Sequence, residues 1–287
     1  MNHNRIIAIA NQKGGVGKTT TCVNLAAAFA TMKYPVLLVD LDPQGNATTG
    51  CGIDPRRLHV SACEVLLGER SIEETLLHPE GLGFDLLPAN GDLTAAEVAL
   101  LQQDGREYAL KRALQPLSAR YAWILIDCPP SLNMLTLNAL AAADSVLIPV
   151  QCEYYALEGL TALLNTIEQV RASINPDLEI EGLLRTMYDG RNKLADAVSD
   201  QLIENFGDRV YRTLVPRNIR VAEAPSYGMP VLRYDPWSKG SLAHVALAGE
   251  MLRRYEKRGR GDAAWTPAVV TETAPIKARG MKFGDSK

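Results

Sequence analysis

The sequence lacks the features that mark several large classes of protein. Its five cysteines are scattered without a C-x-x-C pair, and its four histidines form no cluster at the spacing of metal ligands. No apolar run approaches the roughly 18 residues that span a bilayer. The first strand-like run begins at Ile6, which leaves no room for a signal peptide. We therefore expect a cytoplasmic protein without membrane contacts, whose cysteines are reduced and mostly small core residues. They are Cys22, Cys51, Cys63, Cys128 and Cys152.

An excess of positive charge is also missing. The formal net charge of the 287 residues is −3, which argues against a globally basic nucleic-acid-binding protein. Any contact with DNA must therefore come from a local patch. A chain of 287 residues with a hydrophobic content of 47 % is long enough for one large domain or for two smaller ones.

Short apolar runs alternate with segments of helical pattern along most of the chain. The runs cover residues 6–10, 36–39, 84–87, 123–126, 146–150 and 178–184, and they read as strands buried on both faces. Helical patterns cover residues 20–32, 95–101, 107–117, 135–142, 157–173, 195–205 and about 241–257. This alternation predicts an α/β fold with a doubly wound, mostly parallel sheet and helices on both of its faces.

The chain changes character near residue 259. Residues 259–287 contain glycine, proline and mixed charge with little apolar periodicity, and we expect a disordered tail there. Strand-like runs continue without a linker to about residue 235, so residues 1–258 are predicted to form a single domain.

A glycine-rich segment, residues 11–20, lies between the first strand-like run and the first helix. This context is typical of a phosphate-binding loop, here called the P-loop. Its glycines let the backbone amides approach phosphates, and the following helix adds the positive end of its dipole. Lys18 would reach the β and γ phosphates, and the Thr19 hydroxyl could bind Mg²⁺. The residues expected to bind ATP are Lys13, Gly14, Gly15, Val16, Gly17, Lys18, Thr19 and Thr20.

The P-loop departs from the standard pattern in two places. Gln12 stands where a glycine is usual, and Lys13 precedes the paired glycines. Lys-Gly-Gly-x-Gly-Lys-Thr resembles the deviant Walker A box of the ParA/MinD family of P-loop ATPases. The resemblance covers about residues 5–256 and makes residues 1–258 a ParA-like ATPase domain. It implies that Lys13 crosses a dimer interface to touch the nucleotide of the other subunit.

Three carboxylates follow predicted strands. Asp40 and Asp42 belong to Asp-x-Asp-Pro-Gln-Gly-Asn, which resembles the switch I segment of this family. The resemblance implies that Asp42 orients or activates the attacking water, while Asp40 supports Mg²⁺ in its first or second shell. Asp127 closes an apolar strand and is followed by Cys-Pro-Pro, as in switch II, where a Walker B aspartate holds Mg²⁺ through water. The expected catalytic residues are thus Lys13, Lys18 and Asp42, and the expected metal site comprises Thr19, Asp40 and Asp127.

Two segments near the C-terminus resemble those of chromosomal, Soj-type members of the family. They are Pro-Arg-Asn at residues 216–218 and Glu-Ala-Pro-Ser at residues 223–226. The resemblance places Pro216 and Asn218 near the adenine, although a plain turn would read in the same way.

Basic residues also gather in this third of the chain, and their contacts with phosphates would give sequence-independent, salt-sensitive DNA binding. Arg233 matches a position implicated in DNA binding in Soj-type relatives, and Arg220 and Arg217 are further candidates. Nothing resembling a helix-turn-helix domain precedes the P-loop, so we expect binding to bulk chromosomal DNA.

These observations lead to the hypothesis of a ParA/Soj-type ATPase that partitions chromosomes or plasmids and associates with the nucleoid. It would form an ATP-dependent sandwich homodimer with Mg²⁺, bind nonspecific double-stranded DNA, and hydrolyse ATP weakly until a ParB-type centromere-binding protein stimulates it. A ParA-like positioning ATPase for a protein cargo and a MinD-like division-site regulator are alternatives, as is a nucleotide-gated DNA-binding module. The tail lacks the basic amphipathic helix that a MinD-like membrane anchor needs.

Overall fold

A computed structural model describes residues 5–154 and 156–258 of the chain. It divides into two compact units between Met251 and Leu252. The first unit holds all the strands described below. Of the second, only residues 252–258 at the end of the last helix are described. The predicted tail, residues 259–287, lies outside the described residues.

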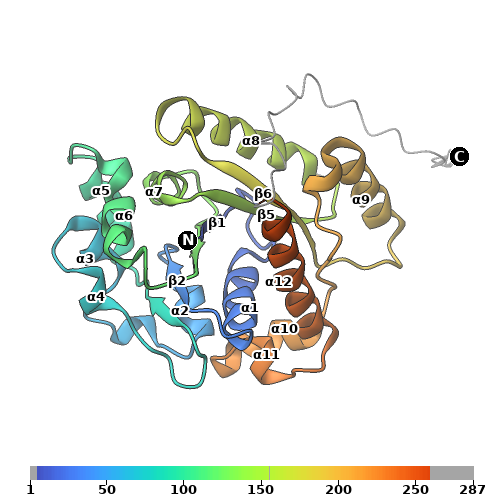
Figure 1. Cartoon of the computed structure of the whole chain (residues 1–287), viewed down its shortest axis with the longest axis horizontal. Coiled ribbons are helices and arrows are strands. Elements are labelled where there is room, and N and C mark those ends of the chain that lie inside the picture. Colours follow the sequence, from blue (N-terminus) through green and yellow to red (C-terminus); the bar gives the residue numbers. More distant parts are fainter. Residues whose placement is uncertain (1–4, 155, 259–287) are drawn as a thin grey trace, which may run out of the picture. The chain divides into compact units, whose positions relative to one another are not determined.

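A six-stranded sheet forms the centre of the first unit (Figure 1). Its strands are β1 (Arg5–Ile9), β2 (Val36–Asp40), β3 (Asp85–Leu87), β4 (Trp123–Asp127), β5 (Ser145–Gln151) and β6 (Glu179–Thr186). They lie in the order β3-β2-β4-β1-β5-β6, and every neighbouring pair is parallel. All six predicted strands are present, and the predicted α/β fold with a parallel sheet is confirmed.

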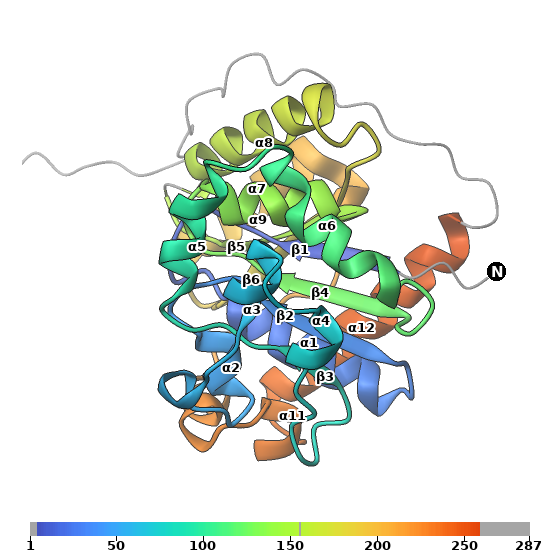
Figure 2. The ribbon, with the colours of Figure 1, turned by 90° about the vertical axis from the view of Figure 1, so that its left-hand side faces the viewer.

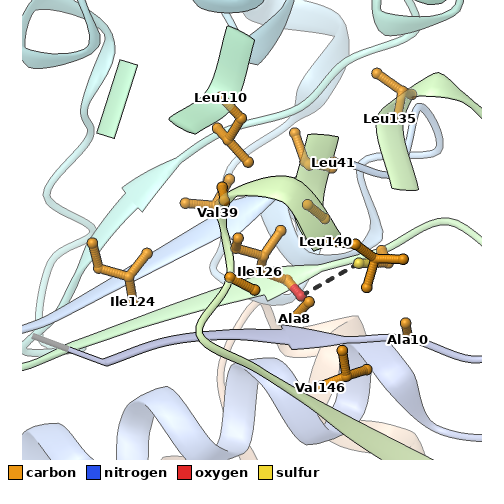
Figure 3. Packing of buried hydrophobic residues seen from close by; sticks show 14 of the residues in the cluster. Ala8, Ala10, Val39, Leu41, Leu110, Ile124, Ile126, Leu135, Leu140 and Val146 are labelled. Atoms are coloured by element: carbon orange, nitrogen blue, oxygen red, sulfur yellow. Dashed lines mark hydrogen bonds between the residues drawn. The ribbon is translucent and has the colours of Figure 1, made fainter. Parts of the chain in front are cut away.

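The central strands are buried on both faces, which explains why their sequences read as continuous apolar runs. Successive side chains of a strand point to opposite faces. Ala8, Val39, Ile124 and Ile126 therefore join one large apolar cluster with Leu110 and Leu140 from covering helices (Figure 3). The intervening residues, such as Ile7, Leu38 and Leu125, are equally buried but do not belong to that cluster. Covering both faces requires helices on both sides of the sheet.

Figure 2 shows α1 on one side of the sheet and α7 and α8 on the other. The helices are α1 (Lys18–Thr31), α2 (Asn46–Gly50), α3 (Ala62–Leu67), α4 (Ile72–Thr75), α5 (Leu93–Leu100), α6 (Ala109–Leu114), α7 (Met134–Ala142), α8 (Ala156–Ser173), α9 (Lys193–Phe206), α10 (Ile219–Glu223), α11 (Val231–Tyr234) and α12 (Lys239–Arg258). All seven predicted helices are present. In the predicted helix at residues 107–117, however, the α-helical part ends at Leu114, because Pro116 has no amide to continue the hydrogen bonding.

Five short helices, α2, α3, α4, α10 and α11, were not predicted. Each has four to six residues, which is too few for a 3.6-residue period to stand out. Local caps mark several of them instead. Ser61 and Glu64 form a capping box at α3, and Asn218 caps α10.

The cysteines agree with a further expectation. All five cysteines are free thiols and all are buried, as small core residues would be. Over the described part of the chain, no helix combines the length and the apolar character that crossing a bilayer requires.

Candidate active site

The P-loop and the predicted carboxylates meet at one edge of the sheet. Ile9 at the end of β1 pairs with Asp127 at the end of β4, and Asp127 pairs in turn with Asp40 at the end of β2. The carboxyl ends of parallel strands lie side by side, so the loops that follow these three strands share the edge where ligands bind in such folds. The structure therefore brings together three segments that lie far apart in the sequence.

At two positions of the P-loop, the backbone has a conformation that only glycine adopts without strain. Gly15 and Gly17 have φ angles of 73° and 87°, and Gly17 is the N-terminal cap of α1. No side chain caps that helix end, so the amides of its first turn remain available to an anion. Gly14 and Gly15 are exposed, whereas Val16 is buried and anchors the loop.

Two residues outside the predicted set brace the P-loop. The Asn11 side-chain amide donates to the Pro149 carbonyl at 2.7 Å, and its oxygen accepts from the Lys13 amide at 3.0 Å. The Thr186 hydroxyl, at the end of β6, donates to the Val16 carbonyl at 2.8 Å. No local motif assigned this role to Thr186, because its contact depends on how β6 and the P-loop meet in space.

Lys18 is almost completely buried within the site. Its Nζ donates to the Lys13 carbonyl at 3.2 Å. Burial lowers the pKa of Lys18, while the negative charges of Asp127 and Asp42 oppose this shift. The lysine therefore lies among the predicted carboxylates, in a setting where a bound polyphosphate would add the negative charge that it needs.

Lys13 forms an ion pair within its own chain. Its Nζ lies 2.6 Å from Oε2 of Glu153, which follows the end of β5. The Gln151 side chain donates to the other Glu153 oxygen, Oε1, at 2.5 Å. The two paired side chains keep 36 % and 48 % of their surface exposed. Glu153 was not among the predicted site residues. It binds Lys13, the lysine that the resemblance expects to touch the nucleotide of the opposite subunit.

Asp40 and Asp42 play different parts in the loop after β2. Asp40 is fully buried, and its Oδ2 accepts hydrogen bonds from the amide and the hydroxyl of Thr48 at 2.8 and 2.7 Å. Its Oδ1 accepts from the Asp42 amide at 3.1 Å. Burial raises the pKa of Asp40 to about 6, against the effect of these hydrogen bonds. Asp40 thus fixes the loop that carries Asp42, whose Oδ1 accepts from the Gln44 amide at 3.0 Å.

Asp127 is fully buried at the end of β4. Burial, followed by repulsion from Asp40, raises its pKa well above the usual value, while Thr19 and Lys18 oppose the rise. Its Oδ1 lies 3.6 Å from the Cys22 thiol, and its Oδ2 is buried without a hydrogen-bond partner among the described residues.

Such an orphaned oxygen beside Thr19 and Lys18 suits a Mg²⁺ ion whose other ligands are phosphate and water. The described residues contain no group of three or more His, Cys, Asp or Glu side chains that could hold a metal by themselves.

The Cys22 thiol keeps its proton in this environment. Burial raises the pKa of Cys22 well above its ordinary value, and the nearby Asp127 carboxylate raises it further. Cys128 is also buried, but its thiol lies 3.9 Å from the Ile126 carbonyl and belongs to the apolar cluster.

The segment predicted to contact adenine lies next to a strand that braces the P-loop. Tyr188, two residues after Thr186, forms a parallel bridge with Pro216. The Asn218 side chain accepts from the amides of Arg220 and Val221 at 2.9 and 3.2 Å and so caps α10. The structure therefore places Pro216 beside the extension of β6, and it gives Asn218 a structural role as a cap.

The three candidate DNA-binding arginines lie on or next to α10 and α11, and all are exposed. Arg220 forms ion pairs with Glu223 at 2.9 Å and with Asp235 at 3.4 Å, so its charge is largely compensated. Within residues 5–154 and 156–258, no ion pair is found for Arg217 or Arg233. These two arginines are consequently the better candidates for contacts with phosphates.

Comparison with known proteins supplies the context for this site. Residues 4–180 match a protein family described as an AAA domain. The chromosome partitioning protein ParA of Myxococcus xanthus is 54 % identical over 251 residues, which cover 87 % of this chain and 88 % of that protein. The chromosome-partitioning ATPase Soj of Thermus thermophilus is 52 % identical over 253 residues, covering 88 % of this chain and 97 % of that protein.

Among solved structures, cobyrinic acid a,c-diamide synthase from Mycobacterium smegmatis with bound ADP and magnesium superposes with a TM-score of 0.79. It is 42 % identical and covers 92 % of this chain and 100 % of its own. Its name denotes a different activity, so the shared structure concerns the fold and the nucleotide site.

Proposed function

The chain belongs to the ParA/Soj family of chromosome-partitioning P-loop ATPases, and from this membership we propose the cycle in which it works. ATP and Mg²⁺ assemble two chains into a sandwich homodimer, which binds nonspecific double-stranded DNA and so associates with the nucleoid in the cytoplasm. Hydrolysis is slow until a ParB-type centromere-binding protein stimulates it, and hydrolysis releases the dimer from DNA.

ATP and Mg²⁺ fit the residues at the carboxyl edge of the sheet. The amides from Gly14 to Thr19 and the Lys18 ammonium would bind the phosphates. The Thr19 hydroxyl and the unpartnered Asp127 oxygen would hold the metal, directly or through water. Mg²⁺ supplies charge neutralisation on the β and γ phosphates when bound. The ADP and magnesium in the M. smegmatis relative support this assignment.

The observation that carries the proposal is the convergence of Lys18, Asp42 and Asp127 at the P-loop. In phosphoryl transfer the protein contributes chiefly by positioning reactants and stabilising charge. Asp42 would orient the attacking water and accept its proton. Asp40 would act indirectly, because both of its oxygens already hold the loop that carries Asp42. Lys18 would stabilise the negative charge that develops on the γ phosphate.

Lys13 would complete the site of the other subunit. To do so it has to leave Glu153, its partner within the same chain. Formation of the ATP-bound dimer therefore competes with an intramolecular ion pair, which offers a physical reason for slow turnover in the absence of a partner protein.

DNA binding would use the exposed surface of α10 and α11. We rank Arg233 first and Arg217 second, and Arg220 last because Glu223 and Asp235 already compensate its charge. A dimer presents this surface twice, so dimerisation raises DNA affinity without any refolding.

The test is binding to random-sequence duplex DNA with ATP, with ADP and without nucleotide, over a series of salt concentrations. We expect binding with ATP only, and a decline of affinity with salt. Arg233→Ala should weaken binding. The slope of the logarithm of the binding constant against the logarithm of the salt concentration should become shallower by about one for each lost phosphate contact. Arg70→Ala, which changes an exposed arginine on another part of the unit, is the matched control and should leave binding unchanged.

Binding that is absent, or indifferent to the nucleotide, would overturn the DNA-partitioning proposal. ATP hydrolysis without DNA binding would favour the alternative of a ParA-like ATPase that positions a protein cargo. A ParB-type protein should accelerate hydrolysis if the chain partitions DNA, and it should have no effect if the chain positions a protein cargo.

A further inference from the structure

Cys22 occupies a position on α1 that faces the proposed magnesium site. It lies four residues after Lys18 and three after Thr19, so all three share one face of the helix. The side chain is completely buried, and its Sγ lies 3.6 Å from Oδ1 of Asp127. The P-loop helix thus contacts the switch II aspartate through Cys22 as well as through the Thr19 hydroxyl.

The two oxygens of Asp127 are in different situations. Oδ1 receives the Cys22 thiol, whereas Oδ2 is buried and has no hydrogen-bond partner among the described residues. A carboxylate can rotate about its last torsion, and that torsion is broad when nothing fixes it. A donor on one oxygen therefore decides where the other oxygen points.

We propose that Cys22 is a positioning residue for the magnesium site. Its thiol holds Oδ1 of Asp127, so that Oδ2 stays directed toward Mg²⁺ or its bound water. This inference rests on the proposed function of Asp127 as the switch II aspartate, and it assigns a role to a residue that the sequence motifs did not include. The thiol is suited to this task, because a weak neutral donor orients the carboxylate without neutralising its charge.

Cys128 provides an internal comparison. It is as deeply buried and is the immediate neighbour of Asp127 in the sequence. Its sulfur, however, lies 3.9 Å from the Ile126 carbonyl on the face of the sheet that carries the apolar cluster. A cysteine that only fills space near the site should behave like Cys128, whereas a positioning residue should not.

Four variants separate positioning from packing. Cys22→Ser keeps a donor, Cys22→Ala removes both donor and volume, and Cys22→Val keeps volume without a donor. Cys128→Ala is the matched control. Thermal melting of each variant shows whether it is folded. If Cys22→Ala does not fold, the comparison of Cys22→Ser with Cys22→Val distinguishes positioning from packing.

The affinity of the full chain for Mn²⁺ in the presence of ADP is measured by electron paramagnetic resonance, with Mg²⁺ as a competitor. We expect the apparent Kd to rise about five-fold in Cys22→Ala and Cys22→Val, the effect of losing one neutral hydrogen bond. Cys22→Ser and Cys128→Ala should stay within about two-fold of wild type. In steady-state hydrolysis, the Ala and Val variants should need more Mg²⁺ for half-maximal rate, and saturating Mg²⁺ should restore the rate.

Wild-type affinity in Cys22→Val would overturn the inference, because volume alone would then suffice. An equal loss in all four variants would also overturn it, since the effect would then be one of packing. If the wild-type chain binds no Mn²⁺ with ADP, the proposed magnesium site itself fails, and this outcome is distinct from a failure of Cys22.

Discussion

Replacing Glu153 by glutamine should strengthen ATP-dependent dimerisation. Glu153 pairs with Lys13 at 2.6 Å within one chain, and the proposed function requires Lys13 to reach the nucleotide of the opposite subunit. The two contacts exclude each other. Glu153→Gln keeps the size of the side chain and removes its charge. Lys13 then breaks its contact with residue 153 at a lower cost in free energy.

The size of the effect follows from the exposure of the pair. Both side chains keep between a third and a half of their surface in solvent, at 36 % and 48 %. Ion pairs of this kind contribute about 0.2–1 kcal/mol. Each homodimer breaks two such pairs, so the gain in dimer affinity should be about two- to thirty-fold at low salt. It should disappear at about 1 M salt, where the screening length is only about 3 Å.

The assay is sedimentation equilibrium with a nonhydrolysable ATP analogue. Glu168→Gln is a matched control, because Glu168 also pairs on the surface, with Arg171 at 2.5 Å, but lies in the middle of α8. In a Lys13→Ala chain, Glu153→Gln should have no effect. The reasoning is refuted if Glu153→Gln dimerises no more tightly than Glu168→Gln, or if it has the same effect without Lys13.

Three further predictions concern the loop, switch I and stability. Gly17→Ala should weaken nucleotide binding at least ten-fold in a fluorescence titration, because a φ of 87° strains any residue with a Cβ atom. Thr48→Val should lower the free energy of urea unfolding by about 2 kcal/mol, because it removes the hydroxyl that Asp40 and the Ala89 amide share, while Thr31→Val on exposed α1 surface should cost much less. His244 has its pKa lowered to about 4 by burial, so the unfolded chain binds the proton more readily and stability falls as pH drops from about 6.5 toward 4. When the pH falls from 7.5 to 5, the free energy of urea unfolding should decrease by about 2 kcal/mol less in His244→Leu than in wild type. Equal decreases would contradict a lowered pKa of His244 in the folded chain.

The strands and the long helices could be predicted because local patterns carry them. A strand buried on both faces needs apolar residues throughout, as in Val36–Asp40 and Trp123–Asp127, and such runs are visible without any knowledge of the neighbours. Helices of four to six residues leave no comparable pattern. Their ends are fixed by single caps such as Ser61 and Asn218, which read equally well as turns.

The P-loop could also be predicted, because a chemical task fixes its residue types. Glycines at φ angles of 73° and 87° and a lysine that reaches phosphates must stand at set spacings within one short segment. The same holds for Asp127 at the end of an apolar strand. Their neighbours could not be predicted in this way. Thr186 and Glu153 contact the site from other elements, and Cys22, although it lies on the P-loop helix, belongs to no motif.

The sequence by itself determined the alternation of strands and helices, the P-loop and the identity of the carboxylates, because each depends on residues that are close along the chain. Only the tertiary structure decided which partners these groups have. The register of β2 and β4 sets Asp40 beside Asp127, and burial there raises the pKa of both. The packing of α1 on β4 gives Asp127 a thiol on one oxygen, and the end of β5 gives Lys13 a competing carboxylate. Such pairings depend on distances between elements, which no local pattern encodes.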